Sequence, residues 1–144
     1  MKLAKAFGLL HLAQAQSEAH RSAATDRQLS FERACLWYLN QALDAIVDAL
    51  REHHGLRGHG DESQTIKELA SRNLPSAAAD ECLAWPNWSA CRKALSPDPG
   101  GQQMIQSIDD DKLRIQTGRA EGFASWVKEL DALCSQLQTA YAEF

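Results

Sequence analysis

Long apolar segments are missing from this chain of 144 residues. The longest uninterrupted apolar run, Ala34 to Leu39, is far shorter than the roughly 18 residues of a membrane-spanning helix. Basic residues are not in excess either, since 15 Lys and Arg face 19 Asp and Glu and the formal net charge is -4. A mildly acidic chain lacks the positive footprint of a nucleic-acid binder. The sequence therefore predicts no membrane partner and no nucleic-acid partner.

Motifs for cofactors and for nucleophilic catalysis are missing as well. No glycine-rich phosphate-binding pattern occurs, and Gly100-Gly101 stands alone. None of the four cysteines forms a Cys-x-x-Cys pair, which argues against a zinc ribbon and a thioredoxin-like motif. All five histidines precede residue 60, and no serine or cysteine lies in a recognisable nucleophile turn. We therefore expect no cofactor, and the sequence favours a non-enzymatic protein over an enzyme.

The cysteines and the N-terminal segment both favour a cytoplasmic protein. Cys35 and Cys134 lie on apolar helix faces, where a free cysteine behaves as a small hydrophobic residue. The even count permits two disulfides, but the spacing favours none. Lys2 and the apolar residues after it loosely imitate a secretion signal, yet His11 interrupts that short run. Reduced core thiols in the cytoplasm are the simplest interpretation.

What the chain does contain is helical periodicity, most clearly in the segment Phe31–Leu50. Its apolar residues cover so much of a helix circumference that the helix must be buried between others. One set of these residues is Phe31, Cys35, Tyr38, Leu39, Ala42, Ile46 and Leu50, and a second set beside it is Leu36, Leu43 and Val47. If the bundle leaves the second set uncovered, it predicts a homodimer surface.

Similar patterns place helices along the rest of the chain. Breaker residues lie between them, most strongly in the Ser96–Gly101 segment SPDPGG. The expected helices are Leu3 to His20, a second ending at Gly55, Thr65 to Ser71, Ala77 to Ala84, a segment through Leu95, a short one around Met104 to Ile108, and a last one with the stripe Phe123 to Tyr141.

These helices predict an all-α, single-domain helical bundle over residues 1–144. We expect about four main helices and one or two short extra ones. The helix through Phe31–Leu50 and the last helix should form the core pair, and the short connections suggest mostly antiparallel neighbours. Trp37 and Trp126 lie in apolar stripes and are expected in the core.

The segment Trp85-Pro86-Asn87-Trp88 is the first candidate site. Pro86 should break or kink the helix, because it lacks an N–H donor and clashes with the preceding turn. A segment broken in this way can present Trp85 and Trp88 to a partner protein, since tryptophan is enriched at interface anchors. The preferred alternative is that both rings pack under the kink, because Leu83 and Leu95 offer apolar neighbours.

The second candidate site is a histidine cluster. His53, His54, His59 and Asp61 offer imidazole and carboxylate ligands for a metal, and Glu62 ends the cluster. Their spacing matches no established metal site, and adjacent histidines point in different directions on a helix. A solvated helix end followed by a polar loop is the alternative interpretation.

Two sets of aspartates are weaker candidates. Asp44 and Asp48 lie one helical turn apart, but the Glu-x-x-His pattern of a di-iron bundle is missing. We expect Asp48 to form an exposed charge pair with Arg51, three residues later. The run Asp109-Asp110-Asp111 predicts a solvated turn or a helix cap rather than a cation site.

The order of these features resembles a family of short, uncharacterised helical proteins from gammaproteobacteria. The resembling segments are KAFGLLHLAQAQSEAHRSA, FERACLWYLNQALDAIVDALREHHGL, the tryptophan-containing segment before SPDPGG, and FASWVKELDALCSQLQTAYAEF. The resemblance implies a cytoplasmic, bacterial, all-α protein, and it supplies no activity and no site residues.

The sequence as a whole predicts a small protein-interaction module of adaptor or regulatory type. The partner is expected to be another protein, bound through Trp85, Pro86 and Trp88. The alternative is a metal- or small-molecule-binding helical protein that uses the cluster from His53 to Glu62.

Overall fold

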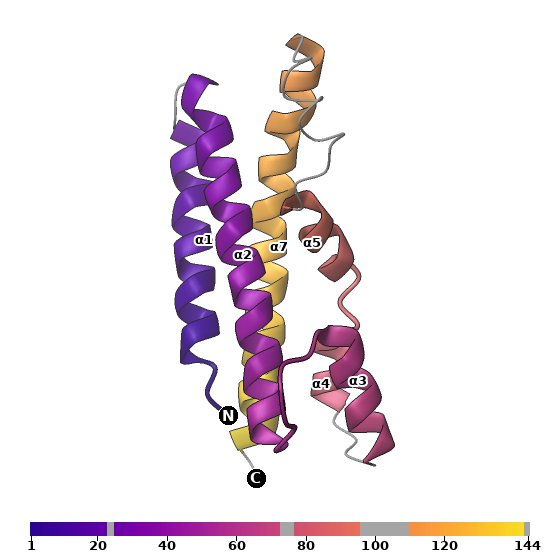
Figure 1. Cartoon of the computed structure of the whole chain (residues 1–144). Helices are drawn as coiled ribbons and strands as arrows, with labels where there is room; N and C mark the ends of the chain where they lie inside the picture. The colour runs from indigo at the N-terminus through magenta and orange to yellow at the C-terminus, as the bar shows by residue number, and fades with distance from the viewer. Residues whose placement is uncertain (23–24, 73–76, 96–109, 143–144) are drawn as a thin grey trace.

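The computed structural model describes residues 1–22, 25–72, 77–95 and 110–142, and these ranges contain helices and no strand. The predicted all-α bundle is confirmed (Figure 1). Of the helices in these described ranges, three are long and three are short, so the described part of the crossover is more broken than expected. The helices are α1 (Ala4–Ser22), α2 (Thr25–His53), α3 (Glu62–Ser71), α4 (Ala77–Leu83), α5 (Trp88–Leu95) and α7 (Asp110–Ala142). The helix expected around Met104 to Ile108 lies outside the described residues.

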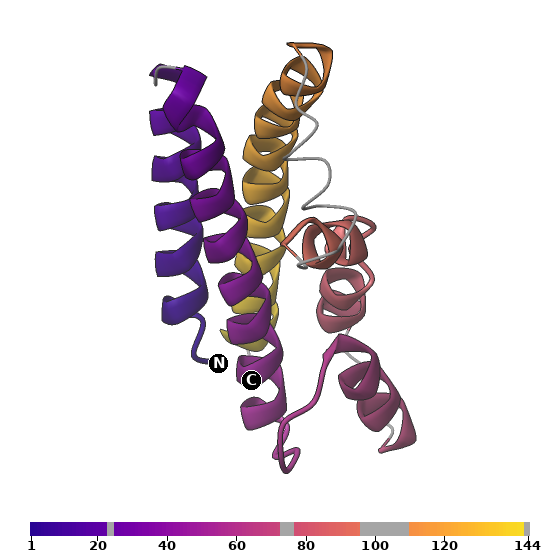
Figure 2. The same ribbon diagram turned by 45° about the horizontal axis from the view of Figure 1, so that its top comes forward.

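The three long helices each pack against the other two as a bundle, and the short helices lie along one side of that bundle (Figure 1). Helix α1 runs antiparallel to α2, whereas α7 runs in the same direction as α2 (Figures 1 and 2). The crossover through α3, α4 and α5 brings the chain back, which is what permits two parallel long helices. The most extensive helix–helix contact is between α1 and α2, so the prediction that α2 and α7 form the main pair is wrong. None of the described helices is long and apolar enough to cross a membrane.

The second half of α2 is buried around most of its circumference, as its apolar pattern predicts, whereas nearer its start Phe31 and Tyr38 are only half-buried. Between residues 39 and 51 only Asp44 and Asp48 are exposed, and Gln41 is half-buried. Each fully buried leucine or isoleucine there contributes about 1.5–3 kcal/mol relative to an exposed one. The surface expected for homodimers is covered by the chain's own helices, because Leu36, Leu43 and Val47 are all buried.

The end of α2 is fixed by a Schellman motif. Gly55 has a φ of 67°, a left-handed conformation that glycine adopts without steric cost. Its N–H donates to the carbonyl of Glu52, and the N–H of Leu56 donates to the carbonyl of Arg51 at 2.8 Å. The predicted helix end at Gly55 is therefore confirmed, and it sends the chain back toward the side of α2.

Candidate functional site

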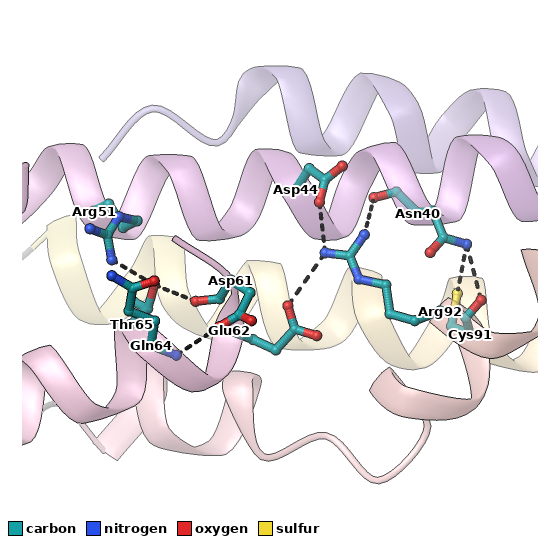
Figure 3. Close-up of polar contacts among 9 residues, drawn as sticks. All are labelled: Asn40, Asp44, Arg51, Asp61, Glu62, Gln64, Thr65, Cys91 and Arg92. Carbon is teal, nitrogen blue, oxygen red and sulfur yellow. Dashed lines mark hydrogen bonds and ion pairs between the residues drawn. The ribbon is translucent and has the colours of Figure 1, made fainter. Parts of the chain in front are cut away.

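An open cleft of about 700 Å³ lies where the returning chain meets α2. It is bordered by α2, the loop before α3, the first turn of α3, and α5. Most of its lining side chains are polar or charged, and Figure 3 shows several of them. The lining residues are Asp44, Val47, Asp48, His59, Gly60, Asp61, Glu62, Gln64 and Arg92. Four carboxylates face one guanidinium, which leaves an excess of three negative charges when His59 is neutral.

Arg92 of α5 is the cation in the cleft wall. Its Nη2 lies 2.6 Å from Oδ1 of Asp44 and 3.5 Å from Oε2 of Glu62, so it joins three helices. Its Nη1 also donates to the carbonyl oxygen of Asn40 at 3.3 Å (Figure 3). The Asn40 side chain donates in turn to the carbonyl of Cys91, which fixes α5 against α2. The carboxylate of Asp48, by contrast, has no hydrogen bond or ion pair with any described residue.

Arg51, at the C-terminal end of α2, binds the loop before α3 and the first part of α3 from inside the protein. Its guanidinium is buried and donates to the carbonyls of Arg57 and Gly58 and to the Thr65 hydroxyl. Its Nη1 also lies 2.7 Å from Oε2 of Glu68. This hydrogen bond holds the pKa of the Glu68 carboxyl below its usual value.

The predicted charge pair between Asp48 and Arg51 is wrong. The expected exposed pair with Asp48 does not form, because the side chain of Arg51 turns inward to the loop and to Glu68. Gly60 leaves the space for this, since a Cβ there would lie 2.7 Å from Nη1 of Arg51. Residue spacing along α2 could not predict these contacts of Arg51, because the carbonyls it binds belong to the loop after the helix.

Helix α3 begins three residues earlier than predicted. Thr65 and Glu68 suggest a capping box, but the helix is capped by Asp61, whose Oδ1 accepts from the N–H of Gln64 at 2.8 Å. Thr65 is instead fully buried inside the helix, where its hydroxyl accepts from Arg51 and donates to the Asp61 carbonyl. The predicted helix end at Ser71 is confirmed.

The four residues proposed as metal ligands separate into two groups. His59 and Asp61 line the cleft, whereas His53 and His54 pack around Tyr141 near the end of α7. A ring nitrogen of His54, Nε2, lies 2.7 Å from the Tyr141 hydroxyl. Burial, together with the neighbouring His53, lowers the pKa of His54. Within the part of the chain that the structure describes, no three His, Cys, Asp or Glu side chains are placed to hold a metal ion.

The proposed partner-binding tryptophans face the interior. Helix α4 ends at Leu83 and α5 begins at Trp88, so the predicted break around Pro86 is confirmed. The side chains of Trp85 and Trp88 are 6% and 4% exposed, and Trp85 lies edge-on to Trp126. This arrangement matches the core alternative; Pro86 is the exposed member of the segment.

Trp37 is the aromatic side chain that sequence reasoning misplaced. It was expected in the core, but 50% of its surface is exposed, and its ring meets Tyr38 edge-on at 5.3 Å. Helical periodicity could have placed Trp37 correctly, because residues seven positions apart, such as Trp37 and Asp44, point within about 20° of each other on an α-helix. Trp37 therefore shares a face with the charged residues Arg33, Asp44 and Asp48 rather than with the apolar stripe.

The four cysteines are free and buried, as the sequence suggests. Burial raises the pKa of the Cys35, Cys82 and Cys91 thiols to about 12 and raises that of Cys134 as well. Thiols in this state are neutral at physiological pH and are poor nucleophiles. None of the four is therefore suited to covalent catalysis.

Comparisons with known proteins add no relative. A scan against protein-family models, a search of curated proteins and a search of solved structures each found no match.

Proposed function

We propose that the protein is a non-enzymatic adaptor or regulator that binds another protein in the bacterial cytoplasm. The binding surface is the outer face of α2, which we define as Trp37, Gln41, Asp44 and Asp48. The resemblance to uncharacterised gammaproteobacterial helical proteins stays a prediction, and it supplies no activity. Four reduced thiols are compatible with the cytoplasm.

The observation that carries the proposal is the half-exposed indole of Trp37. A tryptophan that loses its remaining contact with water on binding contributes a large apolar area, and such residues are typical interface anchors. Most of the neighbouring surface of α2 is already buried within the chain, so the outer face is what remains for a partner. This surface replaces the Trp85–Trp88 segment, which the sequence suggests as the partner-binding site.

Affinity capture from the source cells with the Trp37→Ala variant tests this function. We expect the variant to lose a partner that the unchanged protein retains, because truncation of an interface tryptophan commonly costs 2 kcal/mol or more. The control is Leu12→Ala, which removes a similarly exposed apolar side chain from α1. Circular dichroism should show that both variants keep the native helix content. A partner that binds both variants equally contradicts the proposal.

A further inference from the structure

The outer face of α2 combines an aromatic platform with the two carboxylates of Asp44 and Asp48, and the exposed Arg33 lies one helical turn before Trp37 on the same face. Trp37 and Asp48 are eleven residues apart on one face of the helix, a separation of about 16 Å along its axis. Asp44 lies between them, and the cleft begins at Asp44 and Asp48. The face and the cleft are therefore one continuous surface with the indole at one end.

Some of the carboxylates on this surface have a partner and one has none. Arg92 pairs with Asp44 and Glu62, and Oδ1 of Asp61 is occupied by the cap of α3. Asp48 has no partner among the described residues, although it stands beside three other carboxylates. A positively charged group brought to Asp48 would reduce this excess of negative charge, whereas an anionic ligand would be repelled.

The indole of Trp37 favours the same type of ligand. Among aromatic side chains, tryptophan gives the strongest cation–π attraction for Arg and Lys. Tyr38 meets the Trp37 ring edge-on, and half of the Trp37 surface is still open to a partner. A cation over the Trp37 ring and a second cation at Asp48 would therefore pair with the indole at one end of the face and the unpaired carboxylate at the other.

We infer that the partner docks through a basic segment that spans the outer face of α2. An Arg or Lys side chain of the partner stacks on Trp37, and a second one pairs with Asp48 in the cleft. This inference rests on the proposed interaction function and specifies the chemistry of the partner. Arg92 stays in the cleft wall, since its own carboxylates already hold it.

A synthetic helical peptide provides the probe. It consists of alanine with two arginines eleven residues apart, and its comparison peptide has glutamate in place of both arginines. Fluorescence anisotropy of the labelled peptides at about 50 mM and 200 mM salt measures their affinity for the protein. We expect the arginine peptide to bind more tightly than the glutamate peptide, with an affinity that falls as salt screens the charges.

Matched variants locate the binding. Trp37→Ala and Asp48→Asn should each weaken the arginine peptide by about threefold or more, a loss consistent with a cation–π contact and an exposed ion pair. The control is Asp131→Asn, which makes the same charge change on α7 beside α1, and it should leave the affinity unchanged. Binding that Asp48→Asn and Asp131→Asn weaken equally overturns the inference, because it reports net charge alone.

The inference and the proposed function fail in different ways. If Trp37→Ala removes the cellular partner but the arginine peptide does not bind the unchanged protein, the partner chemistry is wrong and the interaction function stands. If the cellular partner binds Trp37→Ala normally, the interaction function itself is wrong at this surface.

Discussion

A single buried guanidinium holds together the turn that follows α2. Arg51 supplies donors to two loop carbonyls, to Thr65 and to Glu68, and no other described side chain reaches all of these groups. Its flat, forked geometry suits several acceptors at once, which the ammonium of lysine cannot match. The position of α3 beside the cleft therefore depends on the identity of one residue as well as on its charge.

The substitution Arg51→Lys tests this role. We expect it to lower the free energy of unfolding by about 2–4 kcal/mol, because the Arg57 and Gly58 carbonyls lose their charged donor. Urea unfolding followed by circular dichroism measures the change. Arg57→Lys is the matched control, since the side chain of Arg57 is exposed. An Arg51→Lys protein within about 0.5 kcal/mol of the original, the usual range for surface changes, would show that the charge alone suffices.

At the scale of helices, two glycines contribute in opposite ways. Gly55 stands in the left-handed conformation that ends α2, whereas Gly8 lies inside α1. A Cβ at either position would meet nothing within 4 Å, so side-chain crowding plays no part. The effect of a methyl group at each site is therefore set by the backbone.

Alanine at these two positions should shift stability in opposite directions. We expect Gly55→Ala to cost about 1–2 kcal/mol, because an L-residue is strained in the left-handed region. Gly8→Ala should add about 0.5–1 kcal/mol through the higher helix propensity of alanine. Thermal unfolding of the two variants measures both changes. A Gly55→Ala variant that melts at or above the original temperature would contradict the Schellman motif at the end of α2.

The sequence predicts helices better than it predicts their partners and direction. The apolar periodicity of α2 and the break at Pro86 depend on neighbouring residues, and both are confirmed. The parallel course of α2 and α7 depends on how the crossover folds back, which no local pattern encodes. The run from Ala34 to Leu39 is apolar throughout, which suggested that Trp37 is buried. The exposed residues Arg33, Asp44 and Asp48 on the same helix face indicate instead that Trp37 faces solvent.

The candidate site was hardest to predict because it joins segments far apart in the chain. The sequence suggests Asp61 as a metal ligand, whereas in the structure it caps the first turn of α3. Arg92 lies 48 residues from Asp44, and only the folded chain places their charged groups 2.6 Å apart. The histidines were grouped by their closeness in sequence, while the turn at Gly55 sends them to different surfaces.

For the whole molecule, the buried thiols measure how often the bundle opens. All four cysteines are enclosed by packed helices, and burial keeps their pKa values far above neutrality. A thiol with a pKa of about 12 has roughly one part in ten thousand as thiolate at pH 8. Reaction with a disulfide reagent therefore requires the helices to separate first.

We expect the native protein to react with Ellman's reagent at pH 8 much more slowly than the unfolded chain. Absorbance at the thionitrobenzoate band follows the reaction, and the protein in concentrated guanidinium chloride is the control, in which all four thiols should react at once. Slow labelling that accelerates with small amounts of denaturant would report global opening. Rapid native labelling of one thiol would contradict the close packing around that cysteine.

The course of the chain also determines the order in which the molecule can be completed during translation. Helices α1 and α2 leave the ribosome first and can pair through their short connection. The core residues of α7 follow roughly 70 to 90 positions after α2 ends, which at about 5–20 residues per second is a delay of roughly 4 to 18 seconds. Throughout that interval the nascent hairpin exposes the apolar flank that α7 will later cover.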